Sequence, residues 1–88
     1  MSARVLMYCT GSCPYCHAAD RLLALKGVTD IERVRVDLEP ARRAEMRQKS
    51  GRSSVPQIWI GDRHIGGSDD LHDLEDSGQL DPLLAKAP

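Results

Sequence analysis

The chain has 88 residues, 41% of them hydrophobic, with 12 basic and 13 acidic side chains, which suits one compact domain and leaves no room for a second. We therefore expect residues 1–88 to form a single domain. The near-neutral charge excludes the clustered basic surface that nucleic-acid binders need. The apolar run near the start is too short for a signal peptide or a membrane span, so we expect a cytoplasmic protein.

The first strand and helix are predicted from a change in hydrophobic period. An unbroken apolar run at residues 5–8 indicates a strand buried on both faces of a sheet. From Pro14 onward apolar residues recur at helical spacing, on a face that includes Leu22 and Leu25, and Gly27 supplies the stop.

A second strand and helix follow. Val34, Val36 and Leu38 alternate with charged residues, which is typical of a strand with one buried face. Pro40 can then open a helix that runs to about Ser50.

The second half of the chain predicts a hairpin and a last helix. Residues 55–60 form an apolar strand, and a turn at residues 61–62 leads to a short strand around residues 64–65. Ser68 or Asp69 is a good N-cap for the last helix. The remaining leucines pack behind it: Leu80, Leu83 and Leu84. The order β-α-β-α-β-β-α predicts an α/β fold with a four-stranded mixed sheet flanked by helices.

The Cys-Pro-Tyr-Cys sequence at residues 13–16 lies where the first strand gives way to the first helix. Cys13 falls at the N-cap and Pro14 at the first helical position, where a missing N–H costs nothing. The free amides and the positive end of the helix dipole then favour the Cys13 thiolate. Cys16 lies one turn deeper on the same face, within reach of a disulfide. The sequence therefore predicts Cys13 as the nucleophile and Cys16 as the resolving thiol.

Other roles for the thiols have to be weighed. Cys9, Cys13 and Cys16 have the spacing of the cluster motif in radical S-adenosylmethionine enzymes, but those need most of a β/α barrel, which takes about 200 residues. Together with His17 they could form a zinc site, but the usual separated ligand pairs are missing. Buried structural thiols are the third alternative, which the strand-to-helix placement makes weaker. We expect no metal site and an inert, buried Cys9.

Val55 and Pro56 form a second candidate element of the site. A dithiol enzyme must hold a substrate disulfide in line with its nucleophile, and an extended segment can do so by β-like pairing. Pro56 at the start of an apolar strand fits an ordinary strand end or a special turn with a cis peptide bond. The alternative to a substrate-holding role is an ordinary strand-opening proline, and the pairing with the dithiol favours the substrate-holding role.

With these motifs and the Gly-Gly-Ser-Asp-Asp sequence at residues 66–70, the chain closely resembles the dithiol glutaredoxins, particularly the short bacterial ones. The likeness covers essentially the whole chain. It implies a thioredoxin-like fold with a cis Pro56, and glutathione as co-substrate in a groove between the dithiol, residues 54–56 and the turn at residues 66–67. The glutathione contacts that it implies are Tyr15, Arg52, Ser54, Val55, Pro56, Gly67, Ser68 and Asp69.

Within this set the resemblance implies distinct roles. Backbone groups of Val55 pair with the glutathione cysteine, and Arg52 holds the glycyl carboxylate. The start of the last helix, at Ser68 and Asp69, holds the γ-glutamyl end. Thr10 stands where glutaredoxins often carry a lysine, so one cation near the thiolate is missing unless Arg52 or another base compensates.

The resemblance implies a glutathione-dependent reductase of protein–glutathione mixed disulfides and protein disulfides, linked indirectly to glutathione reductase and NADPH. One alternative is a carrier in which two chains bridge a [2Fe-2S] cluster through Cys13 and two glutathiones, although Pro14 argues against it. Another is a redoxin reduced by thioredoxin reductase. We expect a monomer.

The remaining polar residues are interpreted as surface groups. His17, His64 and His72 are expected at the surface. The basic second helix and the acidic third helix are expected to be solvated faces, with partner steering as the lesser alternative.

Overall fold

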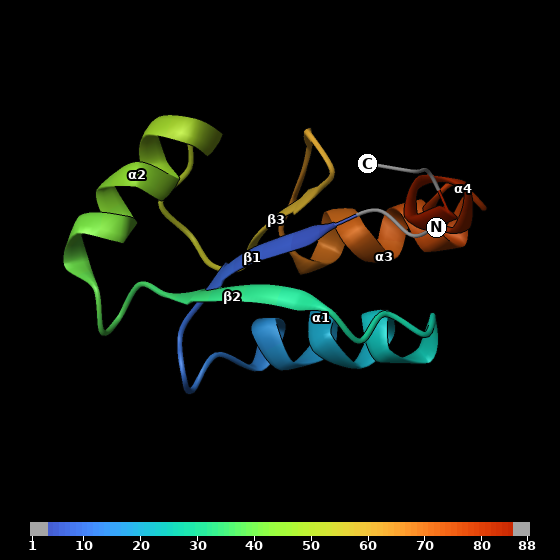
Figure 1. Cartoon of the computed structure of the whole chain (residues 1–88), viewed down its shortest axis with the longest axis horizontal. Helices are drawn as coiled ribbons and strands as arrows, with labels where there is room; N and C mark the ends of the chain where they lie inside the picture. Colours follow the sequence, from blue (N-terminus) through green and yellow to red (C-terminus); the bar gives the residue numbers. More distant parts are fainter. Residues whose placement is uncertain (1–3, 86–88) are drawn as a thin grey trace.

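The computed structural model describes residues 4–85. Its elements in chain order are β1 (Val5–Cys9), α1 (Pro14–Leu25), β2 (Ile31–Arg35), α2 (Pro40–Ser50), β3 (Gln57–Ile60), β4 (Arg63–Gly66), α3 (Ser68–Asp76) and α4 (Leu80–Ala85) (Figure 1). Within residues 4–85 no helix combines the length and the apolar character that crossing a membrane requires.

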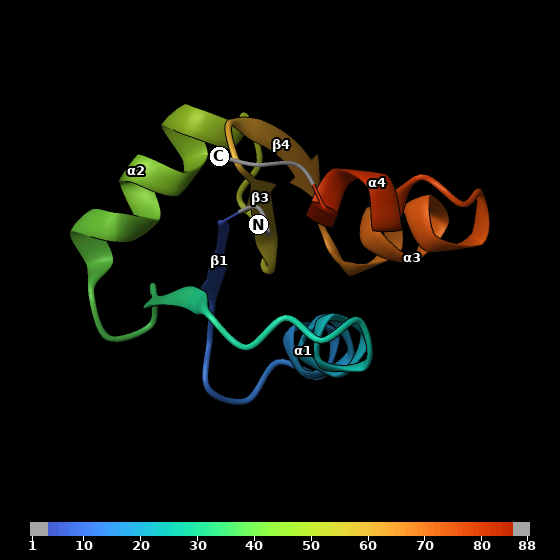
Figure 2. The same ribbon diagram turned by 45° about the vertical axis from the view of Figure 1, so that its right-hand side comes forward.

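The predicted four-stranded mixed sheet is confirmed. The strand order is β2-β1-β3-β4, with β1 parallel to β2 and the other neighbours antiparallel. Figure 2 shows α2 on one side of the strands and α1 and α3 on the other. The sheet is therefore covered on both faces, as the apolar run of β1 predicted.

Each face of the sheet has its own hydrophobic core. Val5, Met7 and Cys9 of β1 pack with α1 and α3, whereas Tyr8 packs with Met46 of α2. This alternation follows from the period of two along a strand. The first core includes Cys16, and Cys13 packs against it. The second core lies on the opposite face of the sheet.

Two apolar residues lie outside the core, contrary to expectation. Leu25 is 84% exposed, whereas the buried face of α1 centres on Ala19 and Leu23. Leu25 lies two residues after Leu23, which is about 200° of helical rotation, so it points away from that face. Leu38 is 69% exposed because β2 ends at Arg35 and the chain turns there. The carbonyl of Arg35 accepts the N–H groups of residues 38 and 39, which ends the strand alternation.

Other element boundaries also differ from the prediction. The leucines that follow α3 belong to a further helix, α4, with Leu80 and Leu84 buried. The N-cap of α3 is Gly67 rather than Ser68 or Asp69. The carboxylate of Asp70 accepts the Gly67 N–H at 2.9 Å, so the third residue of the helix supplies the polar bond instead of the first.

The basic α2 is more than a solvated face. Glu45 accepts hydrogen bonds from the Tyr8 hydroxyl and from Arg42. Lys49 Nζ lies 4.6 Å from the centroid of the Trp59 ring and donates to the Tyr8 hydroxyl at 3.2 Å. The cationic side chains therefore cover the second core.

Candidate active site

The dithiol lies at the start of α1, as predicted. Cys13 is the N-cap residue, in an extended conformation, and Pro14 is the first helical residue. Cys13 is half-buried, whereas Cys16 is only 2% exposed. Both sulfurs are free thiols. Access from solvent therefore favours Cys13.

Burial also separates the two thiols chemically. It raises the pKa of Cys16 to about 12, with further contributions from Cys13 and Cys9 and an opposing backbone hydrogen bond from Thr10. Cys16 is accordingly a protonated thiol at neutral pH. Deprotonation of Cys16 is therefore unfavourable in the reduced protein.

Residues 55–56 lie directly beside the nucleophile position. The Val55–Pro56 peptide bond is cis, as expected. The Cys13 thiol donates to the carbonyl oxygen of Val55, with Sγ 3.8 Å away. Gly67, from the turn before α3, lies close to Pro56. A Cβ added at Gly67 would lie 3.4 Å from the Pro56 carbonyl oxygen. The structure thus brings together all three motifs that the sequence singled out.

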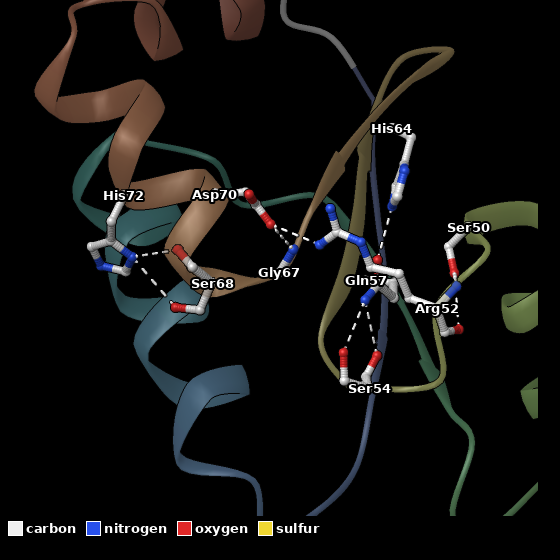
Figure 3. Close-up of polar contacts among 9 residues, drawn as sticks. All are labelled: Ser50, Arg52, Ser54, Gln57, His64, Gly67, Ser68, Asp70 and His72. Atoms are coloured by element: carbon white, nitrogen blue, oxygen red, sulfur yellow. Dashed lines mark hydrogen bonds and ion pairs between the residues drawn. The ribbon is translucent and has the colours of Figure 1, made fainter.

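Arg52 and Gly67 are joined through Asp70, which the sequence reasoning missed (Figure 3). One oxygen of Asp70 accepts both the Gly67 N–H and Arg52 Nη1, each at 2.9 Å. These two bonds hold the pKa of Asp70 below its usual range. Gly66 has φ +115°, and a Cβ there would collide with the carboxylate. A carboxylate two residues into a helix is a capping-box signal that could have found Asp70.

Gln57 and His64 form a second group that was missed (Figure 3). The fully buried Gln57 side chain donates to the Ser54 carbonyl at 3.0 Å, and its own oxygen lies 2.8 Å from His64 Nε2. The expectation that His64 is a surface residue is wrong, because it is half-buried and its ring centroid lies 4.5 Å from that of Trp59. A polar residue inside the apolar run at residues 55–60 was the available signal.

The other residues predicted to contact glutathione differ in exposure. Tyr15 is 62% exposed, and Asp69 is exposed at the start of α3. Ser68 is buried, and its carbonyl accepts a 2.7 Å hydrogen bond from Nδ1 of His72, which is half-buried rather than at the surface. His17 is exposed, as expected.

The loop before Cys13 is held by an ion pair. Arg35 makes a bidentate contact with Asp37, at 2.8 and 2.7 Å, and Asp37 also accepts the Gly11 N–H at 3.2 Å. The Arg35 guanidinium lies against Gly11, where a Cβ would collide with it. A cation therefore lies beside the loop, although Thr10 does not supply it.

Cys9 lies in the first core, only 5% exposed. Burial raises its pKa, and the nearby Asp20 carboxylate adds to that effect. Within residues 4–85 no three cysteine, histidine or acidic side chains gather as metal ligands would.

A dithiol at a helix start, facing a cis-proline segment on a sheet of this topology, defines a thiol-disulfide oxidoreductase of thioredoxin-like fold. Comparison with known proteins narrows the class. Residues 5–65 match the Glutaredoxin family model. The chain is 52% identical to a glutaredoxin of Pseudomonas aeruginosa, over 92% of this chain and 95% of the relative. It is 50% identical to glutaredoxin 3 of Escherichia coli K12, over 93% and 98%. The chain belongs to the glutaredoxin family.

Solved structures agree with this assignment. The glutaredoxin of Brucella melitensis superposes with a TM-score of 0.82 at 45% identity, covering 99% of this chain and 96% of that one. A buckwheat glutaredoxin–glutathione complex superposes with a TM-score of 0.86 at 28% identity, covering 93% and 76%.

Proposed function

We propose that the protein is a glutathione-dependent reductase of protein–glutathione mixed disulfides and of protein disulfides. The observation that carries this proposal is the 3.8 Å contact between Cys13 Sγ and the Val55 carbonyl oxygen. It means that a disulfide paired with the backbone of Val55 lies beside the thiol that attacks it. The buckwheat relative in complex with glutathione supports the same ligand for this chain.

The monothiol reaction needs only Cys13. Its thiolate attacks the glutathione sulfur of a mixed disulfide, the S–S bond breaks, and the protein thiolate leaves and takes up a proton. The thiolate of a second glutathione then attacks the Cys13–glutathione disulfide. This releases glutathione disulfide and restores Cys13. Glutathione reductase and NADPH regenerate the consumed glutathione.

Reduction of a protein disulfide also uses Cys16. Cys13 first forms a mixed disulfide with the protein, and Cys16 then loses its proton and attacks Cys13 Sγ, releasing the reduced protein. Two glutathiones reduce the resulting Cys13–Cys16 disulfide. Potentials of about −200 to −230 mV, typical of glutaredoxins, allow this in a glutathione-buffered cytosol.

For the bound tripeptide we propose the contacts expected from the sequence. Val55 pairs through its backbone with the cysteine residue of glutathione. Arg52 binds the glycyl carboxylate with the guanidinium N–H groups that Asp70 leaves free. The γ-glutamyl carboxylate meets the amides at the start of α3, near Ser68 and Asp69. Tyr15, Ser54, Pro56 and Gly67 line the groove.

Two serine variants test the roles of the thiols. Cys13→Ser should abolish all turnover, because the attacking sulfur is gone. Cys16→Ser should keep deglutathionylation of a mixed disulfide yet lose reduction of an intramolecular protein disulfide. Both activities are measured by coupling to glutathione reductase and NADPH. Equal losses in the two variants would overturn the assigned roles, and Cys9→Ser serves as the control thiol.

A metal-dependent role is the second candidate. A solved structure 46% identical to this chain, with a TM-score of 0.73, is described under the heading of metal binding of glutaredoxins. In such a carrier, two chains would bridge a [2Fe-2S] cluster through Cys13 and two glutathiones. Pro14 argues against this role. A brown colour after anaerobic purification would favour the carrier, and a colourless protein with glutathione-dependent turnover would favour the reductase. The remaining alternative is a redoxin that thioredoxin reductase reduces. Supplying thioredoxin reductase as the sole source of electrons tests this alternative.

A further inference from the structure

The segment that faces Cys13 has little regular structure of its own to hold it. Residues 52–56 lie between the end of α2 and the start of β3, and Ser54 is exposed. Yet the proposed reaction needs the Val55 backbone in a fixed position. A contact from outside residues 52–56 is therefore needed to orient the Val55 backbone.

Gln57 makes the contact that does so. Its side chain is 0% exposed, and its Nε2 donates to the Ser54 carbonyl oxygen at 3.0 Å and lies 3.4 Å from the Ser54 hydroxyl. A buried amide with all its polar groups paired is a rigid group, because every rotation breaks a bond that water cannot replace.

The bond to the Ser54 carbonyl fixes the direction of the Val55 N–H. The Ser54–Val55 peptide is trans, since the cis bond is the next one. In a planar trans peptide the C=O and N–H point in opposite directions. The Ser54 carbonyl points toward Gln57, so the Val55 N–H points away from it, and within residues 4–85 it has no hydrogen-bond acceptor.

His64 sets the orientation of the Gln57 amide. Because the amide nitrogen donates to Ser54, the amide oxygen must face His64, 2.8 Å away, and His64 must carry its proton on Nε2. The His64 ring is held against Trp59, and the register of β3 and β4 shifts between Ile58 and Trp59, which re-aims the side chains of β4. Without the His64 donor, the buried Gln57 oxygen would lose its partner, and the amide that binds the Ser54 carbonyl would be held less firmly.

We infer that Gln57 and His64 are positioning residues for the exchange reaction, acting in series to present the Val55 N–H to the carbonyl of a peptide-like disulfide substrate. This inference rests on the proposed function. It predicts that the pair affects capture of a glutathionylated substrate and leaves the intrinsic reactivity of Cys13 unchanged.

The test compares two reactions of the reduced protein. One is single-turnover reaction with a glutathionylated fluorescent peptide, which uses the Val55 backbone. The other is alkylation by iodoacetamide, which uses only the Cys13 thiolate. Gln57→Met removes the amide at similar length, and His64→Phe keeps the ring against Trp59 but removes its N–H. Gln48→Met, a similar change on the exposed face of α2, is the control.

The rate with the glutathionylated peptide should fall about tenfold in Gln57→Met, the effect of about one lost hydrogen bond. We expect a fall of about threefold in His64→Phe, where Gln57 remains but is no longer oriented. The double variant should be no slower than Gln57→Met, because His64 acts through Gln57. Alkylation should stay within about twofold throughout, and Gln48→Met should match the unaltered protein in both reactions.

Three results would contradict the inference: unchanged peptide rates in both variants, equal losses in both reactions, or additive losses in the double variant. His64→Phe keeps the test open if Gln57→Met fails to fold. Failure of the proposed function is recognised separately, since the unaltered protein would then react no faster with the glutathionylated peptide than with its cysteine mixed disulfide.

Discussion

At the scale of single residues, the two thiols of the dithiol differ mainly through burial. Cys16 belongs to the core that β1, α1 and α3 share, and Cys13 only packs against its edge. A buried thiol resists losing its proton, because the thiolate would lack solvation. The protein therefore holds its second sulfur as a protonated thiol while Cys13 is reduced.

The raised pKa of Cys16 makes stability depend on alkaline pH. Above pH 9, the ordinary pKa of a cysteine, the unfolded chain releases the Cys16 proton, while the folded chain holds it up to about pH 12. The folded state then binds more protons, so the free energy of unfolding should fall as pH rises through this window, by on the order of 1 kcal/mol per pH unit. Urea titrations of the reduced protein measure it.

Cys16→Ser is the control for this dependence, since a serine hydroxyl does not titrate there. Its free energy of unfolding should be flatter between pH 9 and 12. Cys9→Ser should remove a further part of the slope, because burial also raises the pKa of Cys9. A slope that is the same in Cys16→Ser and in the unaltered protein would show that other groups cause it.

At the scale of elements, the turn between β4 and α3 is tied to the segment before β3 by a single carboxylate. Asp70 closes the start of α3 and holds Arg52 at the same time. The side chains of Arg52 and Asp70 are 49% and 41% exposed, so the ion pair itself is worth little, whereas the geometry that it fixes spans the proposed groove.

A double-mutant cycle on Arg52→Ala and Asp70→Asn measures this link. We expect a coupling free energy of about 0.5 kcal/mol in urea unfolding, because solvent screens a half-exposed pair. Asp70→Asn alone should cost more than Arg52→Ala, since it also weakens the bond to the Gly67 N–H. Asp73→Asn, the same change on the exposed face of α3, should have little effect. Purely additive effects would mean that the pair is not formed in solution.

At the scale of the whole molecule, the sheet separates a face that carries the thiols from a face that carries the aromatic cluster. The thiols lie with α1 and α3, and the aromatic cluster of Tyr8 and Trp59 lies under α2. Lys49 spans both rings from α2. Its ammonium group lies near the faces of both rings from the exposed side.

Lys49→Ala should lower the free energy of unfolding by about 1 kcal/mol, because it removes the cation from the two rings and uncovers Trp59. Lys49→Met, which keeps the apolar stem, should recover part of the loss. Arg47→Ala, a neighbouring exposed residue of α2, is the control. Chemical denaturation provides the measurement, and equal values for Lys49→Ala and Arg47→Ala would contradict the role.

Much of this fold could be predicted because the determining signals are local. The apolar run of β1, the proline at the start of α1 and the glycine after α2 each specify structure within a few residues. Leu25 was wrongly placed because a short run of apolar residues does not show which of them the helix buries, and Leu38 was wrongly placed because the pattern does not show where β2 ends. Gln57 and Asp70 were missed because their partners lie in other elements, and only the folded chain brings them together.

Burial of Cys9 and Cys16 also bears on damage by oxidants. Peroxide oxidises exposed thiolates in steps, from sulfenic acid to sulfinic and sulfonic acids that glutathione does not restore. Two of the three sulfurs are covered and held as thiols, so oxidation begins at Cys13. Cys16 lies one helical turn away and can condense with a Cys13 sulfenic acid, losing water. The product is the same disulfide that the catalytic cycle already reduces, so the arrangement that divides labour between the thiols also protects the exposed one.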